Sequence, residues 1–145
     1  MQDPIRVEYK KVKQDALLPT KSRDTDAGYD IYSVVDCDLP PHSTTNVETG
    51  IIITFPVGFF IQIAGRSGLF RKSIAPLGGV IDPTYTGELI VTLTNRSNEV
   101  YRVKKHDRIA QFLIHRVFNC NFVEVEEFSP EYNVRGTNGF GSSGR

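Results

Sequence analysis

Hydrophobic and polar residues alternate with a period of two in several short segments, which is the pattern of β-strands with one buried face. The first such segment is 5–9, where apolar residues alternate with charged ones. Similar or more uniformly apolar segments follow at 31–34, 44–49, 50–55, 59–64, 89–95, 100–103, 108–117 and 122–125. We expect 89–95 and 100–103 to pair across the turn between them. Gly, Pro, Asn and Asp separate the segments, so the pattern predicts roughly ten short strands.

A β-hairpin is predicted around the apolar runs at 80–81 and 89–91. These runs flank a turn-rich stretch in which Pro83 and Gly87 supply the backbone geometry that a chain reversal needs. Two residues of this stretch could also carry chemistry. Asp82 would lie at a strand end, where a carboxylate can hold a water for attack, and Tyr85 could offer a flat face to a base or sugar.

A purely structural interpretation of the same two residues competes with this one. Asp is a common turn residue, and Tyr is a common cross-strand neighbour. The segment alone leaves both interpretations open.

Length and composition narrow the fold class. A chain of 145 residues fits one domain, and 39% hydrophobic residues with 12 Gly and 8 Pro favour many turns over long helices. No repeat and no internal linker is evident. We therefore predict an all-β fold, a jelly-roll-like β-barrel over 1–130, followed by a mobile C-terminal arm over 131–145.

Charge and cysteine usage limit the partners. Lys plus Arg equals Asp plus Glu, at 17 each, so no overall charge would attract nucleic acid or an acidic membrane surface. No apolar run approaches membrane-spanning length. Two cysteines without ligand or disulfide spacing, and three scattered histidines, argue against a zinc site. We expect a soluble intracellular protein that binds neither nucleic acid nor a membrane.

Three further positions are candidates for binding. The predicted strand at 59–64 ends in a small-residue turn, Arg66-Ser67-Gly68, which leads into a short helical stretch and could aim backbone N–H groups, a hydroxyl and a guanidinium at a phosphate. Gln111 is an amide within an apolar strand, so it either bonds neighbouring backbone or faces a polar ligand. Asp30 follows Gly28, which suggests close packing near a carboxylate.

The C-terminal arm is rich in glycine and serine and cannot form a core. A disordered terminus is one interpretation. The other is a closing segment, because Phe140 among glycines could stack on a base while Arg135, Ser142 and Ser143 hold phosphate.

Five segments, taken together, resemble the trimeric deoxyuridine triphosphatase (dUTPase) family in order and spacing. They are AGYDIYS at 27–33, RSG at 66–68, GVID at 79–82 with Tyr85 and Gly87, DRIAQ at 107–111, and RG at 135–136 with GFGSSG at 139–144. Each is weak alone, but five in register are specific. The resemblance implies a homotrimer with active sites at subunit interfaces, which hydrolyses dUTP to dUMP and pyrophosphate with Mg²⁺.

The resemblance also implies roles for individual residues. Asp82 would be the general base that orients a water toward the α-phosphorus, and Asp30 would act on Mg²⁺ indirectly, through water. The implied substrate-binding residues are Arg66, Ser67, Gly68 and Gln111 at the phosphates, Gly79, Tyr85 and Gly87 around the deoxyuridine, and Arg135, Phe140, Gly141, Ser142 and Ser143 in the closing arm.

Two departures and two alternatives accompany the resemblance. Gly65 stands where the family usually has Pro, and Thr86 where a basic or amide side chain is frequent; we expect only slight changes in loop stiffness. The related dCTP deaminases need a Glu near position 92, but Thr92 cannot shuttle protons as a carboxylate does. A non-catalytic binding protein on the same scaffold is the other alternative, although all the assigned side chains are present.

Overall fold

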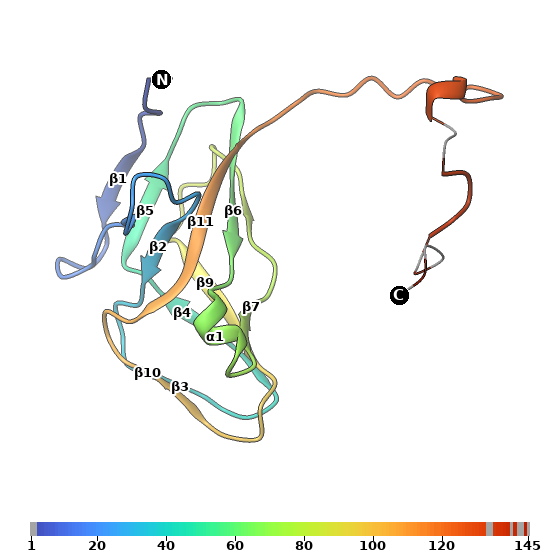
Figure 1. Cartoon of the computed structure of the whole chain (residues 1–145). Coiled ribbons are helices and arrows are strands. Elements are labelled where there is room, and N and C mark those ends of the chain that lie inside the picture. The colour runs from blue at the N-terminus through green and yellow to red at the C-terminus, as the bar shows by residue number, and fades with distance from the viewer. Residues whose placement is uncertain (1–2, 133–134, 140, 142–143, 145) are drawn as a thin grey trace.

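The computed structural model describes residues 3–132, 135–139, 141 and 144, and strands dominate them (Figure 1). The largest sheet has the order β2-β11-β6-β8. Its strands are β2 (Tyr29–Tyr32), β11 (Arg108–Arg116), β6 (Phe59–Ala64) and β8 (Val80–Ile81). A three-stranded sheet has the order β4-β9-β7, formed by β4 (Ser43–Glu48), β9 (Ile90–Asn95) and β7 (Ile74–Pro76).

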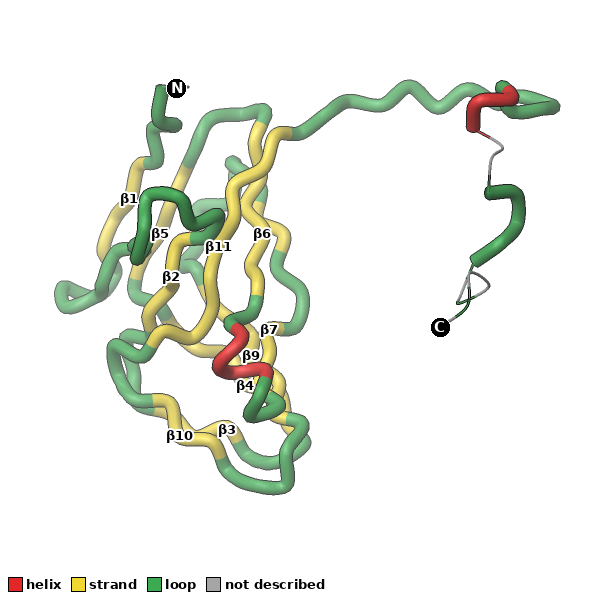
Figure 2. Tube along the Cα trace, viewed as in Figure 1, coloured by secondary structure: helices red, strands yellow, loops and turns green. Residues whose placement is uncertain are grey.

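Two strand pairs complete the β-structure. They join β1 (Glu8–Lys11) to β5 (Ile51–Thr54), and β10 (Tyr101–Val103) to β3 (Cys37–Leu39). All of these pairings are antiparallel. Within the described ranges, the helical elements are one short helix, α1 (Ser67–Phe70), shortly after β6, and a 3₁₀ turn over Pro130–Tyr132 (Figure 2). The arrangement confirms the predicted all-β, jelly-roll-like barrel.

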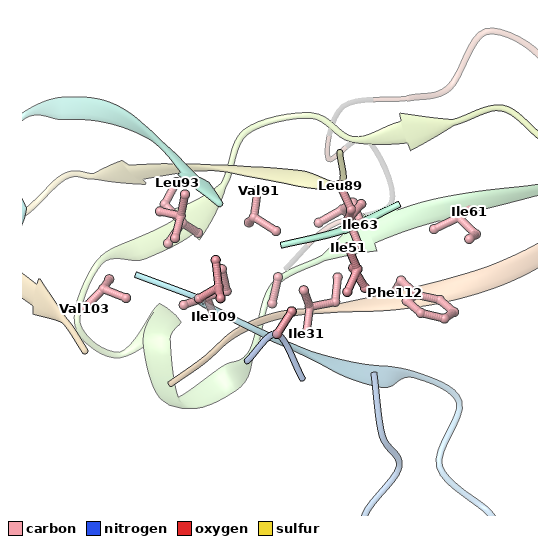
Figure 3. Close-up of a cluster of buried hydrophobic side chains, with 14 of the residues drawn as sticks. Ile31, Ile51, Ile61, Ile63, Leu89, Val91, Leu93, Val103, Ile109 and Phe112 are labelled. Carbon is pink, nitrogen blue, oxygen red and sulfur yellow. The ribbon is translucent and has the colours of Figure 1, made fainter. Parts of the chain in front are cut away.

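The hydrophobic core lies between the sheets (Figure 3). Strand β9 shows how the sequence specifies it, because buried Val91 and Leu93 alternate with half-buried Thr92 and Thr94. Side chains from strands far apart in sequence meet here, since successive residues of a strand point to opposite faces. The fully buried aliphatic side chains include Ile31, Val47, Ile51, Ile61, Leu89 and Ile109.

The N-terminal strand differs from the prediction. β1 begins at Glu8, all its residues are exposed, and its hydrogen-bonded partner is β5. Val7 and Tyr9, expected on a buried face, are 36% and 51% exposed. The predicted burial is wrong within one chain, because β1 lies at the edge of the fold and no described segment covers these side chains.

The predicted hairpin at 80–91 is also wrong. β8 pairs with β6, whereas β9 pairs with β4 and β7, so the two strands belong to different sheets. The reversal itself is present, since the Tyr85 N–H donates to the Asp82 carbonyl at 3.1 Å. The chain crosses from one sheet to the other through this turn. Asp82 nevertheless follows β8 directly, as predicted.

Two further strand predictions are corrected. β10 pairs with β3 and not with β9, because the turn between β9 and β10 leads away from the sheet. No strand forms at 122–125; beyond β11 the chain extends away from the barrel (Figure 1), and Phe122 is 94% exposed. Alternation of apolar residues predicts a strand only where a partner strand is available.

Two remaining observations concern the wider sequence predictions. Both cysteines are free thiols, Cys37 half-buried and Cys120 exposed. Among the described residues, no helix has the length and apolar character needed to cross a bilayer.

Candidate active site

The large sheet brings three sequence segments into one row. Gln111 of β11 pairs with Asp30 of β2 on one side and with Ala64 of β6 on the other. Ala64 is the last residue of β6, so Gly65 and Arg66 follow within the same corner. Three of the sequence-predicted site residues therefore lie side by side because of strand register.

A β-bulge in β11 shapes this corner. Arg108 pairs with Tyr32 and Ala110 with Ile31, so Ile109 is the extra residue. Ile109 and Ala110 are both buried, although successive residues of a regular strand alternate. The bulge lets Arg108 lie on the same side as the half-buried Gln111.

Asp30 binds two arginines. Its Oδ1 accepts a hydrogen bond from Arg66 Nε at 3.1 Å, and its Oδ2 lies 3.7 Å from an Arg108 guanidinium nitrogen. Arg66 also donates from its guanidinium to the Arg108 carbonyl at 3.3 Å. The Asp30 and Arg66 side chains are only 17% and 26% exposed, so solvent screens this pair less than a surface pair. The arrangement fixes a guanidinium at the corner.

The Gln111 amide is satisfied by the protein. Its Nε2 donates to the Gly65 carbonyl at 2.9 Å. Gly28 makes room for this side chain, because a Cβ built on Gly28 would overlap Gln111 Oε1 and lie 3.0 Å from its Cδ. The predicted packing at Gly28 is thus against the amide of Gln111. Among the described residues, the Gln111 carbonyl oxygen and second amide hydrogen make no further hydrogen bond, so they can bind other partners.

The turn after β6 has the predicted short helical form. Arg66 has extended backbone angles, and its carbonyl accepts from the N–H groups of Leu69 and Phe70, both at 3.0 Å. Leu69 is buried and holds α1 to the core. Ser67 and Gly68 are exposed at the start of the turn, where the first N–H groups of a helix lack intrahelical partners.

Arg66 also affects a neighbouring tyrosine. Burial raises the pKa of Tyr101, and the negative charge of Asp107 raises it further, whereas the Arg66 guanidinium lowers it. The net shift is upward, so Tyr101 stays neutral at physiological pH. Arg66 therefore acts electrostatically on Tyr101 as well as on its ion-pair partner Asp30.

The segments on either side of β8 hold the second group of predicted residues, Gly79 before the strand and Asp82, Tyr85 and Gly87 after it. Gly79 has a φ of 118° and lies against β6, where its carbonyl accepts from the Ile63 N–H at 2.7 Å. The Tyr85 hydroxyl donates to the Glu88 carbonyl at 2.9 Å, and a Cβ on Gly87 would overlap that hydroxyl. Asp82 and Tyr85 are exposed.

Asp82 lies far from the Arg66 corner within one chain, although Gly79 bonds Ile63 close to the end of β6. Ile81 pairs with Ile61, so Asp82 is level with Phe60, and Arg66 lies six residues further along. β6 ends at Ala64, four residues beyond Phe60, so at about 3.3 Å per residue the strand alone separates the two by about 13 Å, and Arg66 lies two residues further. A single chain does not place Asp82 beside the Arg66 corner.

The predicted arm residues are only partly described. Arg135 and Gly141 are exposed and belong to the segment that extends away from the barrel (Figure 1). Phe140, Ser142 and Ser143 lie outside the described residues. The arm residues that are described do not contact the predicted site within one chain.

Comparison with known proteins settles the family. The dUTPase family model matches residues 14–144. The chain belongs to the dUTPase family. It is 39% identical to the deoxyuridine 5′-triphosphate nucleotidohydrolase of Nautilia profundicola, over 97% of this chain and 100% of that protein. It is 42% identical to the probable deoxyuridine 5′-triphosphate nucleotidohydrolase of Schizosaccharomyces pombe, over 92% of this chain and 95% of that protein.

Solved dUTPase structures share the fold. The Staphylococcus bacteriophage 80alpha dUTPase, a G164S mutant bound to dUpNHpp, matches with a TM-score of 0.85 and 28% identity over 97% of this chain and 99% of that one. The D95N mutant dUTPase of S. aureus phage phi11, whose structure describes the coordination of a structural Mg(II) ion, matches with a TM-score of 0.77 and 23% identity over 85% of this chain and 98% of that one.

One residue of the corner was missed by the sequence reasoning. Arg108 lies inside the DRIAQ segment that carries the resemblance to the dUTPase family, but it was given no role. Its contact with Asp30 depends on the bulge at Ile109. The available signal for the bulge was that Ile109 and Ala110 are adjacent and both apolar. A regular strand would bury only one of them.

Proposed function

We propose that this chain hydrolyses dUTP to dUMP and pyrophosphate. Its relatives carry the name deoxyuridine 5′-triphosphate nucleotidohydrolase. The observation that carries the proposal is the corner where Arg66 and Gln111 meet, in a chain that matches the dUTPase family over 14–144. A fixed guanidinium and a partly free amide suit a polyphosphate. The exposed carboxylate of Asp82 suits proton removal from water.

In the proposed reaction, Asp82 accepts a proton from a water that attacks the α-phosphorus in line with the departing pyrophosphate. Arg66 with the N–H groups and hydroxyl at Ser67 and Gly68 binds phosphate oxygens. Gln111 donates its remaining amide hydrogen to the α-phosphate. Charge that develops on these oxygens is then met by donors already in position.

The residues present suit an Mg²⁺ ion that binds together with the triphosphate better than an ion held by protein ligands alone. Among the described residues, no group of three or more His, Cys, Asp or Glu side chains could hold a metal. Mg²⁺ typically keeps several waters and binds through one or two carboxylates plus substrate phosphates. Bound in this way, it would neutralise charge on the triphosphate. Asp30 would accept hydrogen bonds from its waters while remaining paired with Arg66.

Selection of deoxyuridine is assigned to the segments that flank β8. Backbone groups near Gly79 and Gly87 would bind the uracil edge, and a mismatched exocyclic amine would leave two donors facing each other. Tyr85, held by its hydroxyl on the Glu88 carbonyl, would lie under the sugar and exclude a 2′-hydroxyl. Phe140 and Gly141 of the arm would cover the base, and Arg135, Ser142 and Ser143 would close on the phosphates.

A homotrimer would reconcile the two groups of site residues, because Asp82 of one chain could face the Arg66 corner of another. Two apolar features support association. A groove of about 410 Å³ between β1, β2, β5 and β11 is lined by Tyr9, Ile53 and Phe112, among others. The extended segment after β11 carries three exposed phenylalanines: Phe118 is 81% exposed, Phe122 94% and Phe128 75%. A neighbouring subunit would cover this apolar surface in the proposed trimer.

The test is a panel of deoxynucleoside triphosphates with the full-length protein, measuring pyrophosphate and ammonia, together with the mass in solution. We expect pyrophosphate from dUTP alone and the mass of a trimer. Ammonia from dCTP would favour a deaminase. If neither pyrophosphate nor ammonia formed, the chain would be a non-catalytic binding protein. Thr92, which donates to Asn46 on β4, offers no carboxylate for deamination.

Asp82→Asn gives the matched test of the general base. The amide keeps the shape but cannot take a proton, so turnover should fall by at least about a thousandfold while dUpNHpp still binds. Unchanged turnover in this variant would remove Asp82 from its role.

A further inference from the structure

Gly65, between β6 and Arg66, is in contact with an aromatic ring. A Cβ built on Gly65 would overlap the Cζ and Cε1 atoms of Phe70 and lie 3.1 Å from Pro76 Cδ. The φ of Gly65 is not in the left-handed region, so the glycine is required for space and not for its backbone conformation. The Phe70 ring thus occupies the volume that any side chain at position 65 would need.

Core packing does not account for this ring. Phe70 is 54% exposed, whereas its neighbour Leu69 is 7% exposed and joins α1 to the core. The Phe70 N–H donates to the Arg66 carbonyl at 3.0 Å, and the Phe70 carbonyl accepts from the Ser73 N–H at 3.0 Å. The ring therefore folds back over the residue that precedes the turn, while its own backbone is bonded to the first residue of that turn.

Gly65 connects the turn to the amide of the site. Its carbonyl accepts from Gln111 Nε2 at 2.9 Å, and its peptide bond leads directly to Arg66. A shift of Gly65 would move both groups together.

We propose that Phe70 is a positioning residue for phosphate binding, because its ring packs on Gly65 and holds Gly65, and through it Arg66 and Gln111, in place. The proposal rests on the proposed function, in which the 66–68 turn and Gln111 bind the triphosphate. Phe70 itself does not touch substrate in this account. Its effect is to narrow the range of positions that the two binding groups can adopt.

Phe70→Ala tests the proposal in the full-length protein. We expect the KM for dUTP and the dissociation constant of dUpNHpp to rise by about 10- to 100-fold, as small misplacements of binding groups can cause. Inhibition by deoxyuridine, which lacks phosphate, should stay unchanged. The melting temperature should change little because Phe70 is half exposed. Val100→Ala, at a similarly exposed residue (56%), should leave all four quantities unchanged.

A merely structural role would give a different result. A lower melting temperature with an unchanged KM, or equal loss of dUpNHpp and deoxyuridine binding, would overturn the proposal. So would a Phe70→Ala enzyme with wild-type KM. Phe70→Leu, which retains part of the contact with Gly65, should recover much of the affinity.

A double-mutant cycle addresses the contact itself. Gly65→Ala should displace the ring and weaken dUpNHpp binding, and Phe70→Ala should make room for the new methyl group. The double variant should therefore lose less affinity than the product of the two single losses. Purely multiplicative losses would contradict a direct contact.

Fluorescence gives a readout that does not need activity. The chain has no tryptophan, so Phe70→Trp introduces a single emitter at this position. Adding Gly65→Ala should shift its emission to the red as the ring is displaced into water, and an unshifted emission would overturn the proposal. Failure of the proposed function would look different: wild-type protein would not hydrolyse dUTP, or Arg66→Ala would bind dUpNHpp normally, whatever happens at Phe70.

Discussion

Replacing Asp30 by Asn separates two roles for this carboxylate. The resemblance to dUTPases assigns it to the water shell of Mg²⁺, whereas the structure places it between Arg66 and Arg108. Asparagine keeps the size of the side chain but removes the charge that both guanidinium groups share. Arg66, 26% exposed, would lose its anionic partner.

The expected loss of stability follows from burial and geometry. A hydrogen bond that involves a charged group contributes about 1.5 to 3 kcal/mol, more than a neutral one. Asparagine can still accept from Arg66 Nε, so part of this contribution survives, and we expect a loss of about 1 to 2 kcal/mol in the free energy of unfolding. For a chain of this size that corresponds to a fall of roughly 3 to 6 °C in melting temperature.

The assay is thermal unfolding with and without Mg²⁺ at a fixed protein concentration, because association makes the melting temperature concentration-dependent. The Asp30→Asn loss should be present without Mg²⁺, since it arises from the arginines. Asp38→Asn is the matched control. Its partner Arg102 donates a hydrogen bond to Asp38 at 2.9 Å, but the Arg102 and Asp38 side chains are 71% and 50% exposed, so the control should unfold like the wild type.

Activity distinguishes the two roles further. If Asp30 mainly holds Arg66, the variant should have a raised KM for dUTP, and the Mg²⁺ concentration that gives half-maximal activity should stay unchanged. The reasoning is refuted if Asp30→Asn unfolds like wild type without Mg²⁺ and its only change is a higher requirement for Mg²⁺.

Three further outcomes are expected. Gly28→Ala should displace the Gln111 side chain and break its bond to the Gly65 carbonyl, which should raise the KM for dUTP by about tenfold and lower stability by about 1 kcal/mol, both measurable in one preparation. Removing residues 135–145 should slow turnover at least about a hundredfold, because the arm is expected to close over the substrate. The melting temperature should change little because no described arm residue belongs to the core, and a large fall in melting temperature would contradict this. Burial, and to a lesser extent the neighbouring aspartates, raise the pKa of Cys37, so little of its reactive thiolate exists at pH 8. Iodoacetamide should therefore modify exposed Cys120 first and Cys37 only at higher pH, which mass spectrometry would detect.

Local sequence patterns predicted many strands but not their partners. The apolar run at 59–64 coincides with β6, and the small-residue turn after it forms α1 as expected. The hairpin at 80–91 failed because a turn motif specifies a reversal and not which sheet receives each strand. The run at 122–125 failed because no strand in the part of the chain that the structure describes pairs with it.

Residue types predicted the candidate site better than its internal contacts. A phosphate-binding turn and a buried amide are visible in the sequence as a small-residue junction and as a polar residue within an apolar strand. The contact between Arg108 and Asp30 is not, because it depends on a bulge that changes which side chains share a face. The contact between Gly65 and Phe70 depends on how α1 folds back, which spacing alone does not reveal.

The separation of Asp82 from Arg66 within a chain determines how two defective copies of the protein would behave together. In the homotrimer that we propose, a copy damaged at one of these residues still lends its intact residue to a neighbour. Two inactive copies, one damaged at each residue, would then complement each other when co-expressed, and about a quarter of the pockets in an equal mixture would be whole. Two damaged copies would complement each other only if their substitutions lie in different halves of the pocket.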